Sequence, residues 1–231
     1  MAVAVVSTIV LARLLTPEEI GLYTVLAALM PLAHGIREFG VGRYLIQTTE
    51  LTEDNVRSAF TLTLVIAWSI AVLFFTLSPF VAEVFDEPTV QQILMVLAIN
   101  FVIIPFGSVS LALLRRHMQF GAIFKINVAS AIVHAVTAIS LAAMGFGAMS
   151  LAWASLSGVV TTVGMIQLFR PAEMAFRPSF KAWRRIASFG SMSTGADLAV
   201  SLGDAATQFI LGRVLGFAAV GYYSRAEGLI S

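Results

Sequence analysis

The stretch INVASAIVHAVTAISLAAMGFGAMSLAWASLSGVVTTVGMIQLF, residues 126–169, runs for 44 residues without Asp, Glu, Lys or Arg. A helix needs about 20 apolar residues to cross the hydrocarbon core of a bilayer, so this stretch is long enough for two spans. Gly145-Phe146-Gly147, near its middle, is typical of a turn. We therefore expect two transmembrane helices joined by a hairpin at residues 145–147.

The rest of the chain follows the same pattern. Residues 58–82 and 88–114 also lack charged side chains, and each stretch is long enough for one span. Residues 20–35 and 186–211 give two further spans, and residues 1–12 look like the end of a truncated first one. Hydrophobic residues make up 58% of the chain and charged residues only 12%, whereas soluble domains carry about 25% charged residues. The sequence therefore predicts an all-α, polytopic transmembrane helix bundle.

Composition also excludes several classes of function. The formal net charge is +1, which predicts no nucleic-acid partner, and the absence of cysteine excludes thiol catalysis and thiolate metal sites. The three histidines lie in three different segments, without the spacing of a metal site, and no glycine-rich loop precedes a Lys-Ser or Lys-Thr pair. We expect no enzyme, metal or cofactor. Without a nucleotide-binding loop, any transport by this chain would be driven by a proton or sodium gradient, or by the gradient of the substrate itself.

Basic residues predict the orientation of the chain in the membrane. The second-to-third, fourth-to-fifth and sixth-to-seventh connections, around residues 50, 117 and 178, hold 11 of the 14 basic residues. The third-to-fourth connection is acidic, and the fifth-to-sixth carries no charge. By the positive-inside rule, the three basic connections are cytoplasmic. The amino terminus is then expected to be cytoplasmic too.

An internal repeat relates the two ends of the chain at a spacing of 200 residues. The sequence LARLL at 11–15, followed by GLY at 21–23, recurs as LGRVL at 211–215, followed by GYY at 221–223. Six predicted helices separate the copies, so both copies face the same side of the membrane. This is a parallel repeat, as found between the halves of some transporters. We expect an amino-terminal six-helix bundle at 1–185 and the first helices of an incomplete second bundle at 186–231.

Several motifs, in order along nearly the whole chain, resemble those of polysaccharide biosynthesis proteins of the Wzx type. They are LARLLTPEEIGLY at 11–23, EFGVG at 38–42, LIQ at 45–47, LTE at 51–53 with SAF at 58–60, LRRHMQF at 114–120, and GRVLG at 212–216 with GYYSRA at 221–226. This oligosaccharide flippase family belongs to the multidrug/oligosaccharidyl-lipid/polysaccharide exporter superfamily. The resemblance implies a MATE-like transporter with two six-helix bundles.

The resemblance also implies a function. It implies export of an undecaprenyl-pyrophosphate-linked oligosaccharide across the bacterial inner membrane by alternating access. The expected partners are this lipid-linked oligosaccharide, membrane lipids, a polysaccharide polymerase and glycosyltransferases. A multidrug or peptidoglycan-precursor exporter of the same superfamily is an alternative, and so is a membrane-embedded polysaccharide polymerase or ligase. The inferred periplasmic connections are short and lack basic pairs, which counts against the enzyme.

The predicted seventh helix carries a polar stripe. Asp197, Ser201, Asp204 and Gln208 are spaced by four, three and four residues, which places them on one face of an α-helix. A carboxylate at bilayer depth costs about 2.5–3.5 kcal/mol on insertion scales, so it normally faces a cavity or a partner. The stripe is expected to line the substrate path or to couple transport to an ion. Pairing with other helices is the structural alternative.

Two further groups complete the expected substrate path. Asn127 and His134 lie, with Ser130 and Thr137, on one face of the predicted fifth helix, where interhelical packing explains them equally well. Arg37, Glu38 and Arg43 lie where the second helix reaches the cytoplasm. Guanidinium groups bind phosphate oxygens bidentately, so the two arginines are candidates to receive a pyrophosphate. They are also ordinary topology anchors. The basic groups at 115–117 and 181–185 are expected to contact anionic lipid heads.

Overall fold

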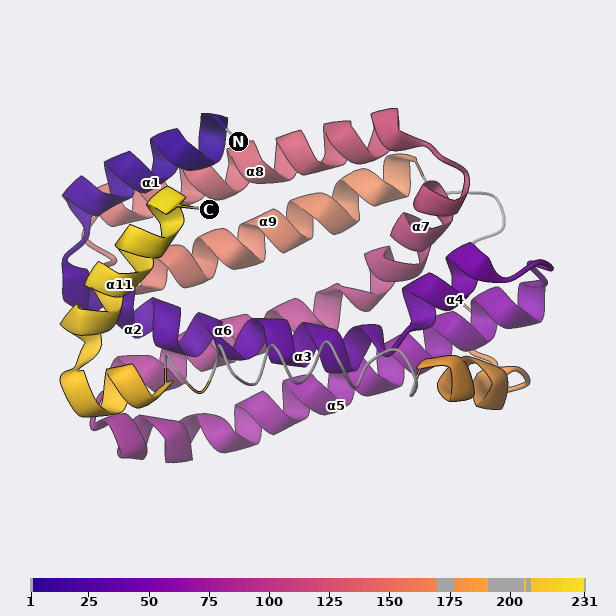
Figure 1. Cartoon of the computed structure of the whole chain (residues 1–231), viewed down its shortest axis with the longest axis horizontal. Coiled ribbons are helices and arrows are strands. Elements are labelled where there is room, and N and C mark those ends of the chain that lie inside the picture. The colour runs from indigo at the N-terminus through magenta and orange to yellow at the C-terminus, as the bar shows by residue number, and fades with distance from the viewer. Residues whose placement is uncertain (1, 170–176, 191–205, 207–208, 231) are drawn as a thin grey trace.

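The computed structural model describes residues 2–169, 177–190, 206 and 209–230, and within these ranges it contains helices and no strand. The helices form one elongated bundle (Figure 1). They are α1 (Ala2–Leu14), α2 (Pro17–Ala27), α3 (Leu29–Glu38), α4 (Val41–Gln47), α5 (Glu53–Phe85), α6 (Pro88–Ile103), α7 (Pro105–Arg116), α8 (Phe120–Ala143), α9 (Met149–Leu168) and α11 (Phe217–Ile230). Residues 183–190 are also helical.

Four helical segments in the described ranges are long and apolar enough to cross a membrane. They are Pro17–Glu38, which joins α2 and α3, then α5, α8 and α9; the bent pair α6–α7 makes a fifth if it counts as one span. The all-α polytopic bundle and the spans over 20–35, 58–82 and 126–169 are confirmed. Most of the expected span at 186–211 lies outside the described residues.

Local sequence signals explain where these helices begin and end. Thr16 and Glu19 form a capping box at the start of α2, because the Glu19 amide donates to Thr16 Oγ1 and the Thr16 amide donates to the Glu19 carboxylate. Pro17 follows at the first helical position, where its missing N–H costs nothing. Between α8 and α9, Gly145 and Gly147 have φ of +84° and +54°, which L side chains rarely adopt. The predicted hairpin at 145–147 is confirmed.

The expected span over 88–114 corresponds to two helices, α6 and α7, that together are long and apolar enough for one span but are bent at their junction. The axis turns by 52° between α6, which ends at Ile103, and α7, which begins at Pro105. Proline has no amide hydrogen, and its ring clashes with the carbonyl four residues earlier, here that of Phe101. The Ile104 carbonyl at the break accepts hydrogen bonds from the amides of Gly107 and Ser108, at 3.0 and 3.1 Å. A hydrophobicity pattern does not register such a break, since every residue around it is apolar.

The connections between helices gather at two ends of the bundle. At one end, which we call the acidic end, a single cavity is lined by residues near the α1–α2, α5–α6 and α8–α9 connections, among them Glu19, Glu87 and Gly147. At the other, the basic end, Arg116 of α7 reaches the α4–α5 connection, and Lys181 pairs with Asp54 at 3.3 Å. Figure 1 shows the two ends at left and right. The three basic connections therefore share one end, as the positive-inside pattern requires.

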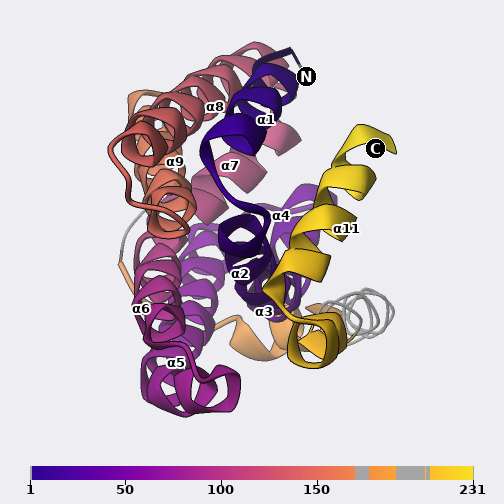
Figure 2. The same cartoon turned by 90° about the vertical axis from the view of Figure 1, so that its left-hand side faces the viewer.

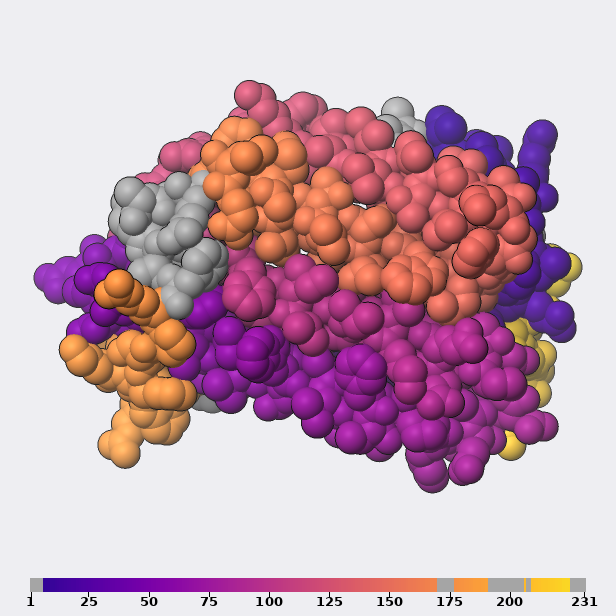
Figure 3. All heavy atoms as spheres, turned by 180° about the vertical axis from the view of Figure 1, so that it is seen from behind, coloured from indigo at the N-terminus to yellow at the C-terminus, as the bar shows by residue number. Residues whose placement is uncertain are grey.

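One layer of the bundle contains α8 and α9, and the other contains α5 and α6. Helix α2 packs against α6 on one side and against α11 on the other. Seen from behind, α8 and α9 lie against α5 and α6 (Figure 3), and the Asn100 side chain of α6 donates to Ser155 Oγ of α9 at 3.1 Å. Leu22 and Leu26 of α2 are buried in one apolar cluster with residues of α6. Figure 2 shows α11 on the other side of α2.

Candidate functional site

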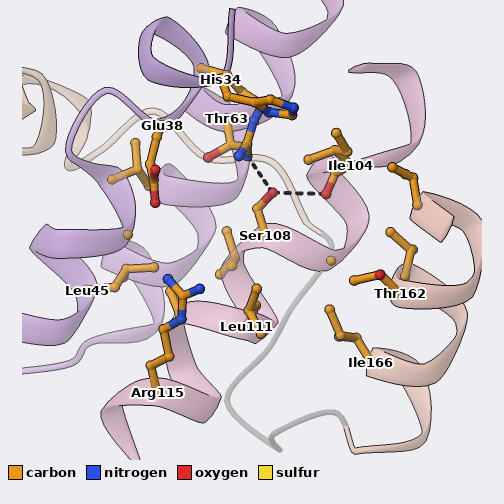
Figure 4. Close-up of a pocket in the computed structure, with 18 residues that line it drawn as sticks. His34, Glu38, Leu45, Thr63, Ile104, Ser108, Leu111, Arg115, Thr162 and Ile166 are labelled. Atoms are coloured by element: carbon orange, nitrogen blue, oxygen red, sulfur yellow. Dashed lines mark hydrogen bonds between the residues drawn. The ribbon is translucent and has the colours of Figure 1, made fainter. Parts of the chain in front are cut away.

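A cavity of about 420 Å³ opens between α3, α4, α7 and α9, toward the basic end of the bundle (Figure 4). This volume lies in the range of small-molecule sites. Its walls are mostly aliphatic, with Leu45 of α4, Leu111 of α7 and Ile166 of α9 among them. The cavity also includes four side chains that carry or can carry charge: His34, Arg37, Glu38 and Arg115. It is therefore an apolar pocket with a few convergent polar groups.

Arg37 is the best-anchored charge in the cavity. It lies in the last turn of α3, and its Nη1 donates a hydrogen bond of 2.7 Å to Ser108 Oγ. Ser108 Oγ in turn donates to the Ile104 carbonyl at 2.9 Å (Figure 4). The hydroxyl's one proton is thereby used, so its oxygen can only accept from the guanidinium. The Nε of Arg37 is buried and has no hydrogen-bond partner within the described part of the chain.

The break between α6 and α7 positions this anchor. Pro105 starts α7 and turns it away from α6, which places Ser108 one turn into the new helix and on the cavity wall. In membrane proteins, irregular backbone occurs where it is buried in protein or lines a cavity. The serine hydroxyl donates to the Ile104 carbonyl at the break and accepts from Arg37 at the same time. Arg37 is thus tied to the bend in the neighbouring span.

Arg115 supplies a second cation, which the sequence analysis did not place in the path. It lies on α7 seven residues after Ser108, hence on the same face of the helix, and it points into the cavity below Glu38 in Figure 4. The spacing of 108 and 115 was a signal available in the sequence. The two arginines outnumber the one carboxylate, so the charged side chains of the cavity have a formal excess of one positive charge. Such an arrangement can hold an anion, and guanidinium forks fit phosphate oxygens.

The neighbouring Arg116 has a different role. Its Nη1 lies 2.7 Å from the carbonyl oxygens of Leu45 and Thr48 and 3.2 Å from that of Ile46. These groups end α4, whose last carbonyls have no partner inside the helix. Arg116 therefore caps α4, where its charge also favours the negative end of the helix dipole. We had expected lipid contacts for both arginines. Arg116 instead contacts backbone carbonyls of the protein, whereas a lipid contact of the exposed Arg115 stays a prediction.

Three other residues expected along the substrate path, Arg43, Asn127 and His134, do not line this cavity. Arg43 is exposed and does not line the cavity. On α8, Asn127 is exposed, whereas His134 is half-buried and faces Gly158 of α9. Ser130 donates a 2.9 Å hydrogen bond to the Gly158 carbonyl, so this stripe joins α8 to α9. The cavity thus brings together Arg37 and Glu38 of the expected set.

The polar stripe of the predicted seventh helix is not part of the described structure. Asp197, Ser201, Asp204 and Gln208 all lie outside the described residues, so their position relative to the cavity stays a prediction. Within the described ranges, no three His, Asp or Glu side chains come close enough together to hold a metal ion.

Comparison with known proteins identifies the family. The model of a family described as polysaccharide biosynthesis protein matches residues 10–231, and the chain belongs to that family. The succinoglycan biosynthesis transport protein ExoT of Rhizobium meliloti is 29% identical over 227 residues, which cover 96% of this chain and 45% of that protein. The lipopolysaccharide biosynthesis protein WzxC of Escherichia coli is 27% identical over 123 residues, 53% of this chain and 25% of that protein.

A third relative also has a name that refers to polysaccharide biosynthesis. The teichuronic acid biosynthesis protein TuaB of Bacillus subtilis is 22% identical over 209 residues, 85% of this chain and 41% of that protein. The chain thus spans less than half the length of each of these curated relatives. No solved structure matches the chain. The expected resemblance to Wzx-type proteins is confirmed.

Proposed function

We propose that this chain, a member of the polysaccharide biosynthesis protein family, forms part of a flippase that moves an undecaprenyl-pyrophosphate-linked oligosaccharide across the bacterial inner membrane. The family and its transport relatives support a role in export for polysaccharide biosynthesis. The substrate class is supported by the cavity. A pyrophosphate joined to a polyprenyl chain combines a compact anion with an apolar tail, and the cavity combines two arginines with aliphatic walls.

The observation that carries this proposal is that Arg37 and Arg115 line the same cavity. Neither cation has a carboxylate within ion-pair distance in the described residues, although Glu38 lines the same cavity. Arg37 also keeps an unpartnered, buried Nε. Burying a charged donor without a partner costs free energy, and an incoming phosphate oxygen would supply the partner. We assign Arg37 and Arg115 to pyrophosphate binding and Ser108 to positioning Arg37.

The sidedness of the site follows from the same proposal. We take the basic end as cytoplasmic, with the amino terminus on that side, because this end gathers the arginines and lysines of the connections. The oligosaccharide is attached to its lipid carrier before export, so a cytoplasmic cavity suits loading. Transport then proceeds by alternating access, coupled to a proton or sodium ion or driven by the substrate gradient. Glycosyltransferases and a polymerase would act before and after this step.

The test compares three arginines in the longest open reading frame that contains these residues. In a strain lacking its own flippase, the wild type should restore surface polysaccharide. Arg37→Gln and Arg115→Gln should reduce it at least tenfold and accumulate the lipid-linked intermediate inside, at unchanged protein level. Arg43→Gln is the matched control, since Arg43 is exposed and outside the cavity. Loss of transport in Arg43→Gln alone, with both cavity variants active, would reject the site.

A further inference from the structure

The cavity lined by Arg37 and Arg115 offers more than a pyrophosphate needs. Its volume is about 420 Å³, within the range of about 300–1,000 Å³ in which pockets enclose drug-sized ligands, and a pyrophosphate is much smaller than such a ligand. Two further polar side chains that line the cavity, Glu38 and Thr162, make no hydrogen bond or ion pair in the described part of the chain. An anion alone explains neither of them.

Glu38 places a carboxylate beside the two arginines. It is the last residue of α3, and its carboxylate faces the cavity above the Arg115 side chain in Figure 4. Gly42, one turn later in the chain, has no side chain, and a Cβ there would lie 3.4 Å from Glu38 Oε1. An ionised carboxylate only accepts hydrogen bonds, and it repels a phosphate. Glu38 therefore weakens anion binding unless a hydrogen-bond donor enters together with the anion.

Thr162 offers a hydroxyl from the α9 wall of the cavity. Threonine in a helix commonly donates to the carbonyl four residues earlier, and the neighbouring Thr161 does so, at 2.8 Å from the Ser157 carbonyl oxygen. The corresponding carbonyl for Thr162 is that of Gly158, which accepts from Ser130 Oγ of α8 at 2.9 Å in addition to the amide within α9. Both lone pairs of that oxygen are then used. The hydroxyl of Thr162 is therefore left for the cavity, which Thr162 lines opposite Glu38 (Figure 4).

We propose that Glu38 and Thr162 bind hydroxyl groups of the sugar attached directly to the pyrophosphate, so that the cavity distinguishes the sugar-loaded lipid carrier from undecaprenyl pyrophosphate alone, the unloaded carrier. This inference rests on the proposed function, because the arginines hold the pyrophosphate that positions the sugar. Both carriers have the same apolar tail and a pyrophosphate, so the arginines and the aliphatic walls bind both. A site that hydrogen-bonds a hydroxyl rejects the analogue that lacks it, because the polar groups of the site are then left unpaired.

The charges of the two carriers explain why a carboxylate belongs in this cavity. The terminal phosphate of the unloaded carrier is a monoester-type group, whose second ionisation has a pKa of about 6. A sugar on that phosphate turns it into a diester and removes this ionisation, so the unloaded carrier has the larger negative charge. Arg37 and Arg115 alone would therefore favour the unloaded carrier. Glu38 repels the larger charge more strongly and accepts from a sugar hydroxyl, so both effects favour the loaded carrier.

The experiment measures the binding of defined carriers to the purified product of the longest open reading frame that contains these residues, in lipid nanodiscs. The probes are undecaprenyl pyrophosphate alone and undecaprenyl pyrophosphate carrying one glucose, galactose or N-acetylglucosamine. The wild type should bind at least one loaded carrier about tenfold or more tightly than the unloaded one, as expected for a hydrogen bond to a charged group. Glu38→Gln should remove most of this preference and bind the unloaded carrier more tightly, because the repulsion is gone. Thr162→Val should lower the preference about threefold, as expected for a neutral hydrogen bond.

Thr161→Val is the matched control, since the Thr161 hydroxyl is bonded within α9 and does not line the cavity. This variant should keep the full preference, and so should Thr162→Ser, which retains the hydroxyl. Arg37→Gln should weaken the binding of loaded and unloaded carriers alike.

The outcomes separate this inference from the proposed function. A wild type that binds loaded and unloaded carriers equally overturns the inference, and full preference in Glu38→Gln or in Thr162→Val overturns the role of that residue. In each of these cases pyrophosphate binding by the arginines still stands. A wild type that binds none of the four carriers instead rejects the proposed function itself.

Discussion

Although Arg115 and Arg116 are adjacent, we expect substitution of Arg115 to reduce transport and substitution of Arg116 to reduce stability. Arg116→Met keeps an unbranched side chain but removes the donors to the end of α4. Two of its contacts are 2.7 Å long, to the carbonyls of Leu45 and Thr48. A hydrogen bond from a charged donor contributes about 1.5–3 kcal/mol. Water can replace the more exposed of these hydrogen bonds. We therefore expect the free energy of unfolding to fall by about 1.5–3 kcal/mol in total.

This loss is measurable in the purified protein. For a chain of this size, about 1 kcal/mol shifts the melting temperature by roughly 2–4 °C, so Arg116→Met should lower it by about 3–12 °C. Helix α4 has only seven residues, too few to be stable without such support. The α4–α5 connection at 48–52 should therefore also become more sensitive to limited proteolysis.

Arg115→Met is the control for stability. Arg115 is exposed and donates no hydrogen bond within the described ranges. Surface substitutions change stability by roughly 0.5 kcal/mol or less, so the melting temperature of the Arg115→Met variant should change by less than about 2 °C. Its transport should nevertheless fall. Equal melting temperatures for the two variants, or a larger loss of stability in Arg115→Met, would refute the assignment of Arg116 to the end of α4.

Three other results are expected. Ser108→Ala should weaken transport about 10-fold or more at unchanged protein level, because Arg37 loses its acceptor, and Ser108→Thr, which keeps the hydroxyl, should retain most of the activity in the same polysaccharide assay. Single cysteines at Glu50 and Met118 should react with an impermeant thiol reagent only after the inner membrane is permeabilised; labelling in intact spheroplasts would reverse the proposed topology. Gly147→Val should destabilise the α8–α9 hairpin by about 1–3 kcal/mol, seen as a lower melting temperature, because Gly147 has φ of +54°.

The arrangement of the spans was readable from the sequence, for a specific reason. Lipid offers no hydrogen bonds, so a chain that crosses it must be helical over about 20 apolar residues. That requirement is local, and residues 126–169 with Gly145 and Gly147 meet it without reference to the rest of the chain. The repeat at 200 residues was also visible, because it is a similarity between two segments of the amino-acid sequence.

The tertiary structure decided which polar residues act together. Arg115 and Arg116 are neighbours in sequence, yet about 100° of rotation on α7 sends one into the cavity and the other to the end of α4. The 52° bend at Pro105 moves Ser108 to Arg37, 71 residues away in the chain. Likewise, the repeat predicted that two segments are equivalent but not that Thr24 and Ser224 touch. The bend has a local cause in Pro105. Helix rotation and crossing depend on packing between distant segments, and hydrophobic periodicity along one segment carries no information about them.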